Sequence, residues 1–158
     1  MAEFSIFQSI QSTEVSDLAE DVRELFEELS AALQSEPRTY AVDARPPLDV
    51  LETDEDVQVV MDMAGVPSNA VRIVFRAGVL LIVGEKARSA PRGPKTFHLI
   101  EREFGRFARG VRLKGSFDVQ QARASIRNGE LTIVLPKLDD RRERAHRIPI
   151  TTDTDPSA

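Results

Sequence analysis

Residue types that commonly carry chemistry are scarce in this chain, and none of them is spaced for a reaction. The 158 residues include no cysteine, which excludes a thiol nucleophile, a disulfide framework and a thiolate metal site. The two histidines, His98 and His146, lie in a strand-like segment beside a loop and in a charged tail, where a surface role is favoured over that of a ligand or base. The sequence therefore predicts a protein that is not an enzyme and has no cofactor or metal site.

Two short motifs look like ligand loops but lack the residues that such loops need. Asp54-Glu55-Asp56 is not followed by the glycine-centred loop and terminal glutamate of a calcium site. The run Gly78–Gly84 continues into Glu85-Lys86, so it lacks the Gly-Lys-Ser/Thr end of a phosphate loop. We expect a solvated hairpin turn at the first motif and no nucleotide site at the second.

Charge is unevenly distributed along the chain, whose formal net charge is −5. Residues 1–36 hold nine acidic side chains and one arginine, whereas residues 87–147 hold 15 basic and seven acidic side chains. Either the two segments attract each other, within or between subunits and in a salt-dependent way, or they form solvated faces of opposite sign. Acids interrupt the basic run 141–147 and no aromatic residue is nearby, so no nucleic-acid partner is predicted.

Composition divides the chain into an N-terminal arm over 1–45, a β-rich domain over 46–137 and a charged extension over 138–158. In the arm, apolar residues between Glu14 and Leu33 recur at spacings of three and four, which predicts an amphipathic helix. Acidic side chains occupy much of its other surface. A helix of this kind must pack its apolar stripe against a partner.

Short apolar runs separated by turn signals predict that 46–137 is all-β, with an immunoglobulin-like sandwich fold. Residues 71–76 alternate as a half-buried strand should, and Val79–Val83 is a continuous apolar run of the kind found inside sandwiches. Asn128-Gly129, between two strand-like runs, is a strong hairpin signal because both residues tolerate positive φ. The predicted strands are 49–53, 57–63, 71–76, 79–83, 97–103, 106–113 and the two arms of a hairpin over 124–137.

Residues 138–158 are too polar to form a core, and we expect a flexible extension. Its exceptions are Ile148 and Ile150, which flank Pro149; the proline keeps the residue before it extended. Because residues two apart in an extended segment project the same way, both isoleucines can enter one groove. No apolar run is long enough to span a bilayer and the N-terminus has no basic region before an apolar stretch, so a cytoplasmic location is expected.

Several of these motifs occur together in a known family. The run Ala-x-x-x-Asn-Gly-x-Leu over 124–131, followed by a polar tail and an Ile-x-Ile, resembles the α-crystallin domain of small heat-shock proteins of the bacterial type. The resemblance extends over about 46–150 and has one departure, because Glu130 follows the Asn-Gly where the family usually has an apolar residue. It also includes Pro47-Leu48-Asp49-Val50, Ala64-Gly65-Val66 and Phe107–Leu113.

The resemblance implies an ATP-independent chaperone of the stress response, which binds non-native client proteins and prevents their aggregation. It implies dimers in which the strand 97–103 crosses to a partner subunit, and a larger homo-oligomer held by Ile148-Pro149-Ile150. The implied dimer-interface residues are Phe97, Leu99, Glu101 and Arg109, the last paired with carboxylates. The implied docking groove is formed by Val71, Ile73, Phe75, Ala122 and Ala124. The implied client-binding residues are Phe4, Ile6, Phe7, Ile10, Leu18, Val22, Leu25, Phe26 and Leu29.

Two other functions are compatible with the same residues. A β-sandwich adaptor without chaperone activity could use Ile148-Pro149-Ile150 as a linear motif for another protein. A monomeric co-chaperone of the same shape could act on a larger chaperone. Both predict a small species in solution, whereas the chaperone predicts a large assembly.

Overall fold

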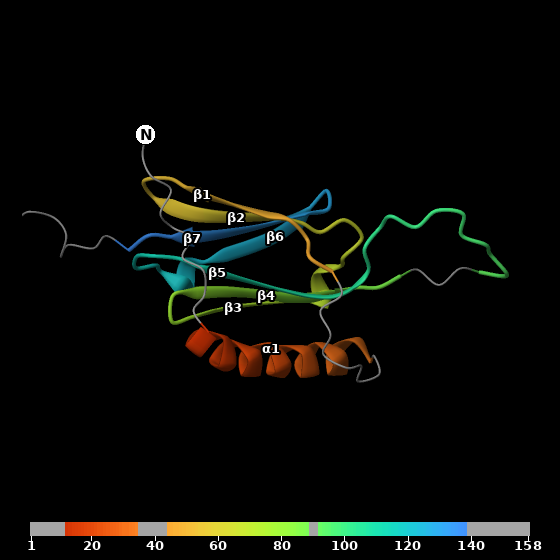
Figure 1. Cartoon of the computed structure of the whole chain (residues 1–158). Coiled ribbons are helices and arrows are strands. Elements are labelled where there is room, and N and C mark those ends of the chain that lie inside the picture. Colours follow the sequence, from red (N-terminus) through yellow and green to blue (C-terminus); the bar gives the residue numbers. More distant parts are fainter. Residues whose placement is uncertain (1–11, 35–43, 89–91, 139–158) are drawn as a thin grey trace, which may run out of the picture.

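The chain folds into two antiparallel β-sheets, with one α-helix along the outer face of the smaller sheet (Figure 1). The computed structural model describes residues 12–34, 44–88 and 92–138. One sheet has four strands in the order β1-β2-β7-β6, and the other has three in the order β3-β4-β5. The elements are α1 (Ser12–Leu33), β1 (Leu48–Glu52), β2 (Asp56–Asp62), β3 (Val71–Arg76), β4 (Val79–Lys86), β5 (Gly105–Arg112), β6 (Arg123–Arg127) and β7 (Glu130–Pro136). The predicted sandwich with an N-terminal helix is confirmed.

Two-residue turns set the register of the hairpins. Asn128 and Gly129 join β6 to β7 with φ of 53° and 75°, and Ala77 and Gly78 join β3 to β4 with φ of 50° and 78°. Left-handed conformations at both positions match the right-handed twist of the flanking strands. The hairpin predicted at Asn128-Gly129 is therefore confirmed. The turn predicted at 54–56 lies one residue earlier, over 53–55, because Asp56 already belongs to β2.

Strand β4 separates two apolar cores. Leu80 and Ile82 belong to the core between the two sheets, whereas Leu81 and Val83 belong to a second core beneath α1. Because successive side chains of a strand point to opposite faces, a continuous apolar run is required where both faces are covered. Gly84 extends this close packing, since a Cβ there would lie 2.3 Å from the ring of Phe107.

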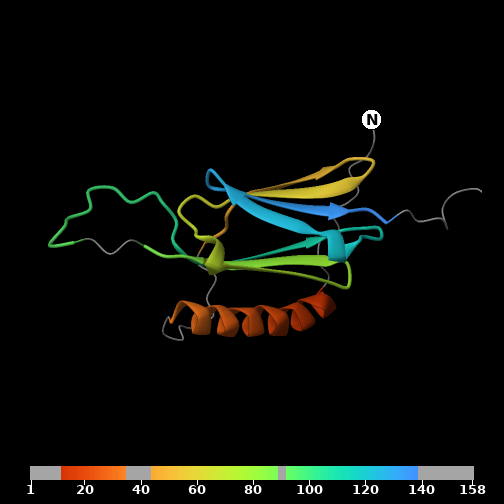
Figure 2. The same ribbon diagram turned by 180° about the vertical axis from the view of Figure 1, so that it is seen from behind.

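Helix α1 packs on the face of the smaller sheet that points away from the sandwich (Figures 1 and 2). Leu25, Phe26 and Leu29 are buried there, and Val22 and Leu33 are partly buried. The partner that the amphipathic stripe requires is thus the β-domain of the same chain.

One predicted strand is absent. Residues 97–103 are described, but they form no strand and lie in a long connection between Lys86 of β4 and Gly105 of β5, which pair with each other. The connection extends beyond the sheets (Figure 1), so within one chain its backbone has no strand edge to pair with. The prediction of a strand over 97–103 is wrong for the single chain.

Candidate functional site

The candidate sites in the described part of the chain are surfaces that can bind another protein segment. Among residues 12–34, 44–88 and 92–138, no three His, Cys, Asp or Glu side chains gather in a way that could hold a metal ion. His98 is exposed in the connection between β4 and β5, and His146 lies outside the described residues. Over the same described ranges, no helix has both the length and the apolar character needed to cross a membrane.

An open apolar groove of about 270 Å³ lies between β3 and β6, the edge strands of the two sheets. Figure 2 shows β6 nearest the viewer on this side of the molecule. Small side chains on the β6 wall, Ala124 and Ser125, leave space above the buried Leu131. The groove is lined by Ser68, Val71, Arg72, Ile73, Ala124, Ser125, Ile126 and Leu131.

Of the five groove residues expected from the sequence, the structure brings Val71, Ile73 and Ala124 together along this recess. Phe75 and Ala122 are not part of its lining and pack partly buried against the main core. The ring of Phe75 meets that of Phe117 edge-on, with centroids 5.7 Å apart. The Ile148-Pro149-Ile150 motif, which is expected to occupy the groove, lies outside the described residues.

The connection between β4 and β5 exposes three large apolar side chains. Phe97 is 57% exposed, Leu99 73% and Ile100 57%. They line a hollow of about 150 Å³ together with Glu101, Phe104, Arg88 and Arg102. Exposed apolar side chains grouped on one segment indicate a contact surface for another molecule.

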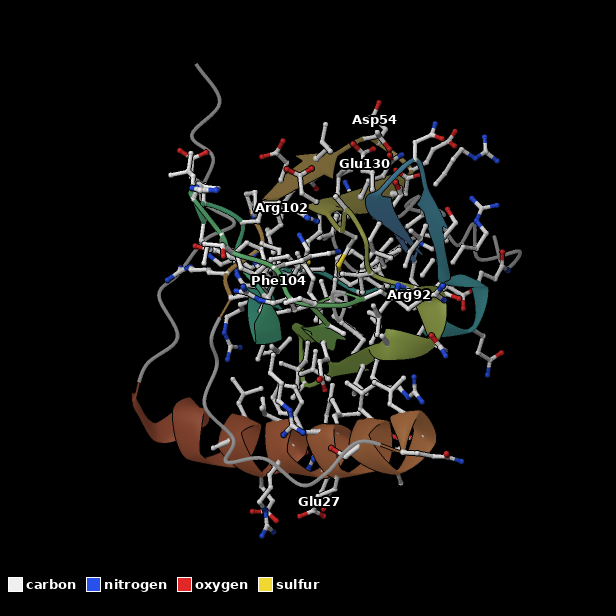
Figure 3. The ribbon with its side chains drawn as sticks, turned by 90° about the vertical axis from the view of Figure 1, so that its right-hand side faces the viewer. Glu27, Asp54, Arg92, Arg102, Phe104 and Glu130 are labelled. Carbon is white, nitrogen blue, oxygen red and sulfur yellow. The ribbon has the colours of Figure 1, made fainter. Side chains whose placement is uncertain are left out.

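Cations surround the ring of Phe104 at the base of this connection. The guanidinium carbons of Arg88 and Arg102 lie 4.8 Å and 4.9 Å from its centroid, and Lys86 Nζ lies 5.5 Å from it. Figure 3 shows Arg102 and Phe104 close together. Attraction between these cations and the π face of the ring stabilises the root of an otherwise extended segment.

Arg109 lies on β5 and is half-buried. Its Nη1 donates a hydrogen bond to the carbonyl oxygen of Pro46 at 2.5 Å, which ties β5 to the segment leading into β1. Burial lowers the pKa of Arg109, and the nearby charge of Arg45 lowers it further. The pairing of Arg109 with carboxylates at a dimer interface stays a prediction.

The helical part of the expected client-binding surface is covered in this structure. Leu25 is 9% exposed, Phe26 0% and Leu29 1%, because they pack on Leu81 and Val83 of β4. Val22 is partly buried beside them, and Leu18 is at intermediate exposure. The other expected client-binding residues, Phe4, Ile6, Phe7 and Ile10, lie outside the described residues.

Charged and polar contacts join α1 to the sheet at its margins. Arg76 Nη1 lies 2.8 Å from Asp21 Oδ1, and Arg72 Nε lies 3.7 Å from Glu28 Oε1. The acidic arm is therefore attracted to cations of the same chain, although these two arginines precede the basic segment 87–147. Glu27 points away from the sheet, toward solvent (Figure 3).

Arg106 of β5 is buried, at 4% exposure, and it is the one such charged or polar residue among those whose burial is described, 18–34, 44–88 and 92–138. Its Nη2 donates a hydrogen bond to Ser30 Oγ of α1 at 2.9 Å, and its guanidinium carbon lies 5.3 Å from the ring centroid of Phe26. Its Nε lies 3.7 Å from Oε2 of Glu85, its direct cross-strand neighbour on β4. Arg106 thus connects the sheet to the centre of the helix interface.

Comparison with known proteins decides the family. A model of the Hsp20/alpha crystallin family matches residues 49–151. This chain belongs to the Hsp20/alpha-crystallin family of small heat-shock proteins. The 18.9 kDa heat shock protein of Oryza sativa subsp. japonica is 34% identical over 145 residues, which cover 87% of this chain and 82% of that protein.

Solved structures of the family share the fold. Heat shock protein 16.0 from Schizosaccharomyces pombe aligns with a TM-score of 0.59 at 28% identity, over 69% of this chain and 100% of that one. A small heat-shock protein from Xylella fastidiosa, described as having a distinct high order structure, aligns with a TM-score of 0.55 at 26% identity, over 72% of this chain and 99% of that one.

Family membership confirms the resemblance inferred from the sequence motifs. Small heat-shock proteins are ATP-independent chaperones of the stress response and are not enzymes, which confirms the non-enzymatic prediction. The family also assembles into oligomers, so self-association is a property of its members.

Two residues of the site were not predicted from the sequence. Arg106 contacts α1 from the sheet, and Phe104 binds cations at the base of the long connection. A signal for Arg106 exists, because it alternates with the apolar Phe107 and therefore lies on the outer face of the sheet. A polar residue on a face otherwise formed by apolar side chains indicates a specific contact. No local signal identifies Phe104, since its cations come from both ends of the connection.

Proposed function

We propose that this protein is an ATP-independent holdase, which binds non-native client proteins through apolar surface and keeps them from aggregating. The observation that carries the proposal is the apolar stripe of α1, formed by Leu25, Phe26 and Leu29, on the scaffold of a chaperone family. Non-native proteins expose apolar segments that otherwise associate with one another. Burying one large apolar side chain contributes roughly 1.5–3 kcal/mol, so several side chains can hold a client without a specific sequence.

Clients would be bound by the N-terminal arm, through Phe4, Ile6, Phe7, Ile10 and the stripe of α1. In the structure that stripe is covered by β4, so Leu25, Phe26 and Leu29 can reach a client only after α1 leaves the sheet. Client and sheet then compete for the same apolar side chains, so the fraction of α1 that binds client rises with client concentration.

Self-assembly would use the long connection and the C-terminal motif. We propose that 97–103 pairs with the sheet edge of a partner subunit, which would give this segment the strand neighbour it lacks in the single chain. Phe97, Leu99 and Glu101 are all exposed and accessible for this exchange, and β1 is an edge strand of the larger sheet.

Ile148 and Ile150 would then dock in the groove between β3 and β6 of a neighbouring dimer. The segment from Leu138 to Arg147 spans roughly 30 Å when extended, which is enough to reach an adjacent dimer. The Xylella fastidiosa relative, with its high order structure, supports assembly beyond the dimer.

An aggregation assay tests the proposed function. A heated client is followed by light scattering, with the full chain at an equimolar ratio of subunits and without nucleotide. We expect suppressed scattering and a soluble complex of client and chaperone. Absence of protection at this ratio, or protection that requires ATP, would refute the holdase.

Size-exclusion chromatography separates the holdase from the adaptor and the monomeric co-chaperone. Those alternatives predict a single species of 17.6 kDa, whereas the proposed assembly predicts a much larger one. The cytoplasmic location expected from the sequence stays a prediction.

A further inference from the structure

The outer face of the smaller sheet is shaped to receive a helix. Its apolar floor is formed by Val74, Leu81, Val83 and Ala108, which pack against α1. In the strand register, Val83 lies between Arg72 and Ala108, and Leu81 lies between Val74 and Gly110. Gly110 has no side chain to add to the floor, so nothing projects there toward the helix.

Cations mark one margin of this face at a spacing that fits a helix. Arg72 and Arg76 are four residues apart on β3, or about 13 Å at 3.3 Å per residue. Their partners Asp21 and Glu28 are seven residues apart on α1, or about 10.5 Å at 1.5 Å per residue. Long arginine side chains can take up the difference, so two carboxylates two helical turns apart match the two arginines.

The opposite part of the face holds a buried charge. Arg106 and Glu85 lie 3.7 Å apart at their nearest atoms, an ion pair longer than a hydrogen bond. Removing charges from water is unfavourable, and the pair offsets only part of that loss. Departure of α1 exposes Arg106 to water, which offsets part of the loss of its contacts with Ser30 and Phe26.

We propose that this face is a receptor for acidic amphipathic helices, that α1 is its resident occupant, and that a helical segment of a client can replace α1. The inference rests on the proposed holdase function only in taking clients as the source of the helix. The occupant is defined by α1 itself: apolar residues at the spacing of Val22, Leu25, Phe26 and Leu29, with carboxylates at the positions of Asp21 and Glu28.

A labelled synthetic peptide of residues 12–34 is the probe, and fluorescence anisotropy with the full-length chain is the measurement. The wild-type chain should bind weakly, because its own α1 occupies the face. The full-length D21K/E28K chain, altered only on the helix, should bind at least about tenfold more tightly, because a larger fraction of its receptor faces is vacant. Its substitutions lie at the margin of α1 and replace no residue of either apolar core.

Peptides and chains with altered charges serve as the matched controls. A peptide with Asp21→Asn and Glu28→Gln keeps its shape but should bind several-fold more weakly, and binding of the original peptide should fall with added salt. A full-length R72E/R76E chain repels its own α1 in the same way, and it should bind a peptide carrying Asp21→Lys and Glu28→Lys more tightly than the original peptide. Circular dichroism of each chain checks that the sandwich is folded.

Two results would overturn the receptor. One is equal peptide affinity for the wild-type and D21K/E28K chains; the other is no change of peptide preference when the charges are exchanged. Failure of the aggregation assay with peptide binding intact would refute the holdase and leave the receptor standing. Protection of the client without the expected peptide binding would refute the receptor alone.

Discussion

Two apolar surfaces on the smaller sheet of this chain differ in whether the chain itself covers them. The groove between β3 and β6 is open, with Ala124 exposed on one wall, whereas the outer face of the same smaller sheet is filled by α1. Strand β3 contributes to both, because Ile73 points to the groove side and Val74 to the helix side. The open groove can be occupied directly by a segment of another subunit. The covered face can bind another segment only after α1 has left it.

The difference in coverage predicts that assembly and client binding can be separated by mutation. Variants at the groove or its ligand should change the mass of the assembly. Variants at the helix interface should change how often α1 leaves the sheet.

The largest effect is expected from I148A/I150A. Loss of both side chains removes the proposed ligand of the groove, so the assembly should dissociate toward dimers while the sandwich stays folded. Light-scattering mass across a dilution series measures this, and T151A/T152A in the same tail is the matched control. An unchanged mass for the double isoleucine variant would show that Ile148 and Ile150 have no role in assembly.

Replacement of Arg106 should have the largest effect on the folded chain. R106M leaves Glu85 as a carboxylate without its cross-strand cation and should destabilise the chain by about 3–5 kcal/mol. The E85Q/R106M double variant should recover most of this loss, since no lone charge then remains. Urea unfolding measures both, with the exposed Arg123→Met as control; strictly additive effects would contradict the ion pair.

Truncation of the helix stripe should come next. L29A creates a cavity between α1 and β4 and should lower the free energy of unfolding by about 2–3 kcal/mol, the lower part of the range for buried leucines, because α1 can shift. V119A, at a valine that is 50% exposed and lies in no proposed interface, should change stability by no more than about 0.5 kcal/mol. Equal losses for the two variants would mean that α1 is not docked in solution. The mass of the assembly should be the same for both.

The smallest effect is expected at Arg72, which borders both surfaces. Its side chain lines the groove and pairs at 3.7 Å with Glu28, whose side chain is 63% exposed. R72A should therefore alter stability by less than about 1 kcal/mol. It should nevertheless change both assembly mass and α1 exchange slightly, and a change in only one of them would mean that the surfaces are independent.

Local signals in the sequence predicted most of the sandwich. Asn128-Gly129 specifies its hairpin through backbone conformation alone, and the alternation at Val71 and Ile73 reports a face that is buried in any β-sandwich. The segment 97–103 was mispredicted because alternation indicates that a strand can form, while the strand itself requires a neighbouring edge. That edge is absent from the single chain.

The stripe of α1 was predicted, but its partner was not. The relevant signal lies far away in sequence, in the unbroken apolar run of β4, where Leu81 and Val83 need a cover that the other sheet does not provide. Helical periodicity shows that a face must be buried and does not show against what. Arg106 could likewise be placed on the outer face from its alternation, but its contacts with Ser30 and Phe26 depend on the tertiary fold.

The central claim is that α1 leaves the sheet when the chaperone holds a client. Hydrogen exchange of the full-length chain, with and without an excess of heated client, tests it directly. Most of the stability of a helix in a protein comes from its tertiary packing, so the amides of Leu25, Phe26 and Leu29 should lose protection by about tenfold or more when α1 leaves the sheet. Those of Val59 and Ile133 in the sandwich core should not change. Unchanged protection of α1 in a preparation that keeps its client soluble would contradict the claim.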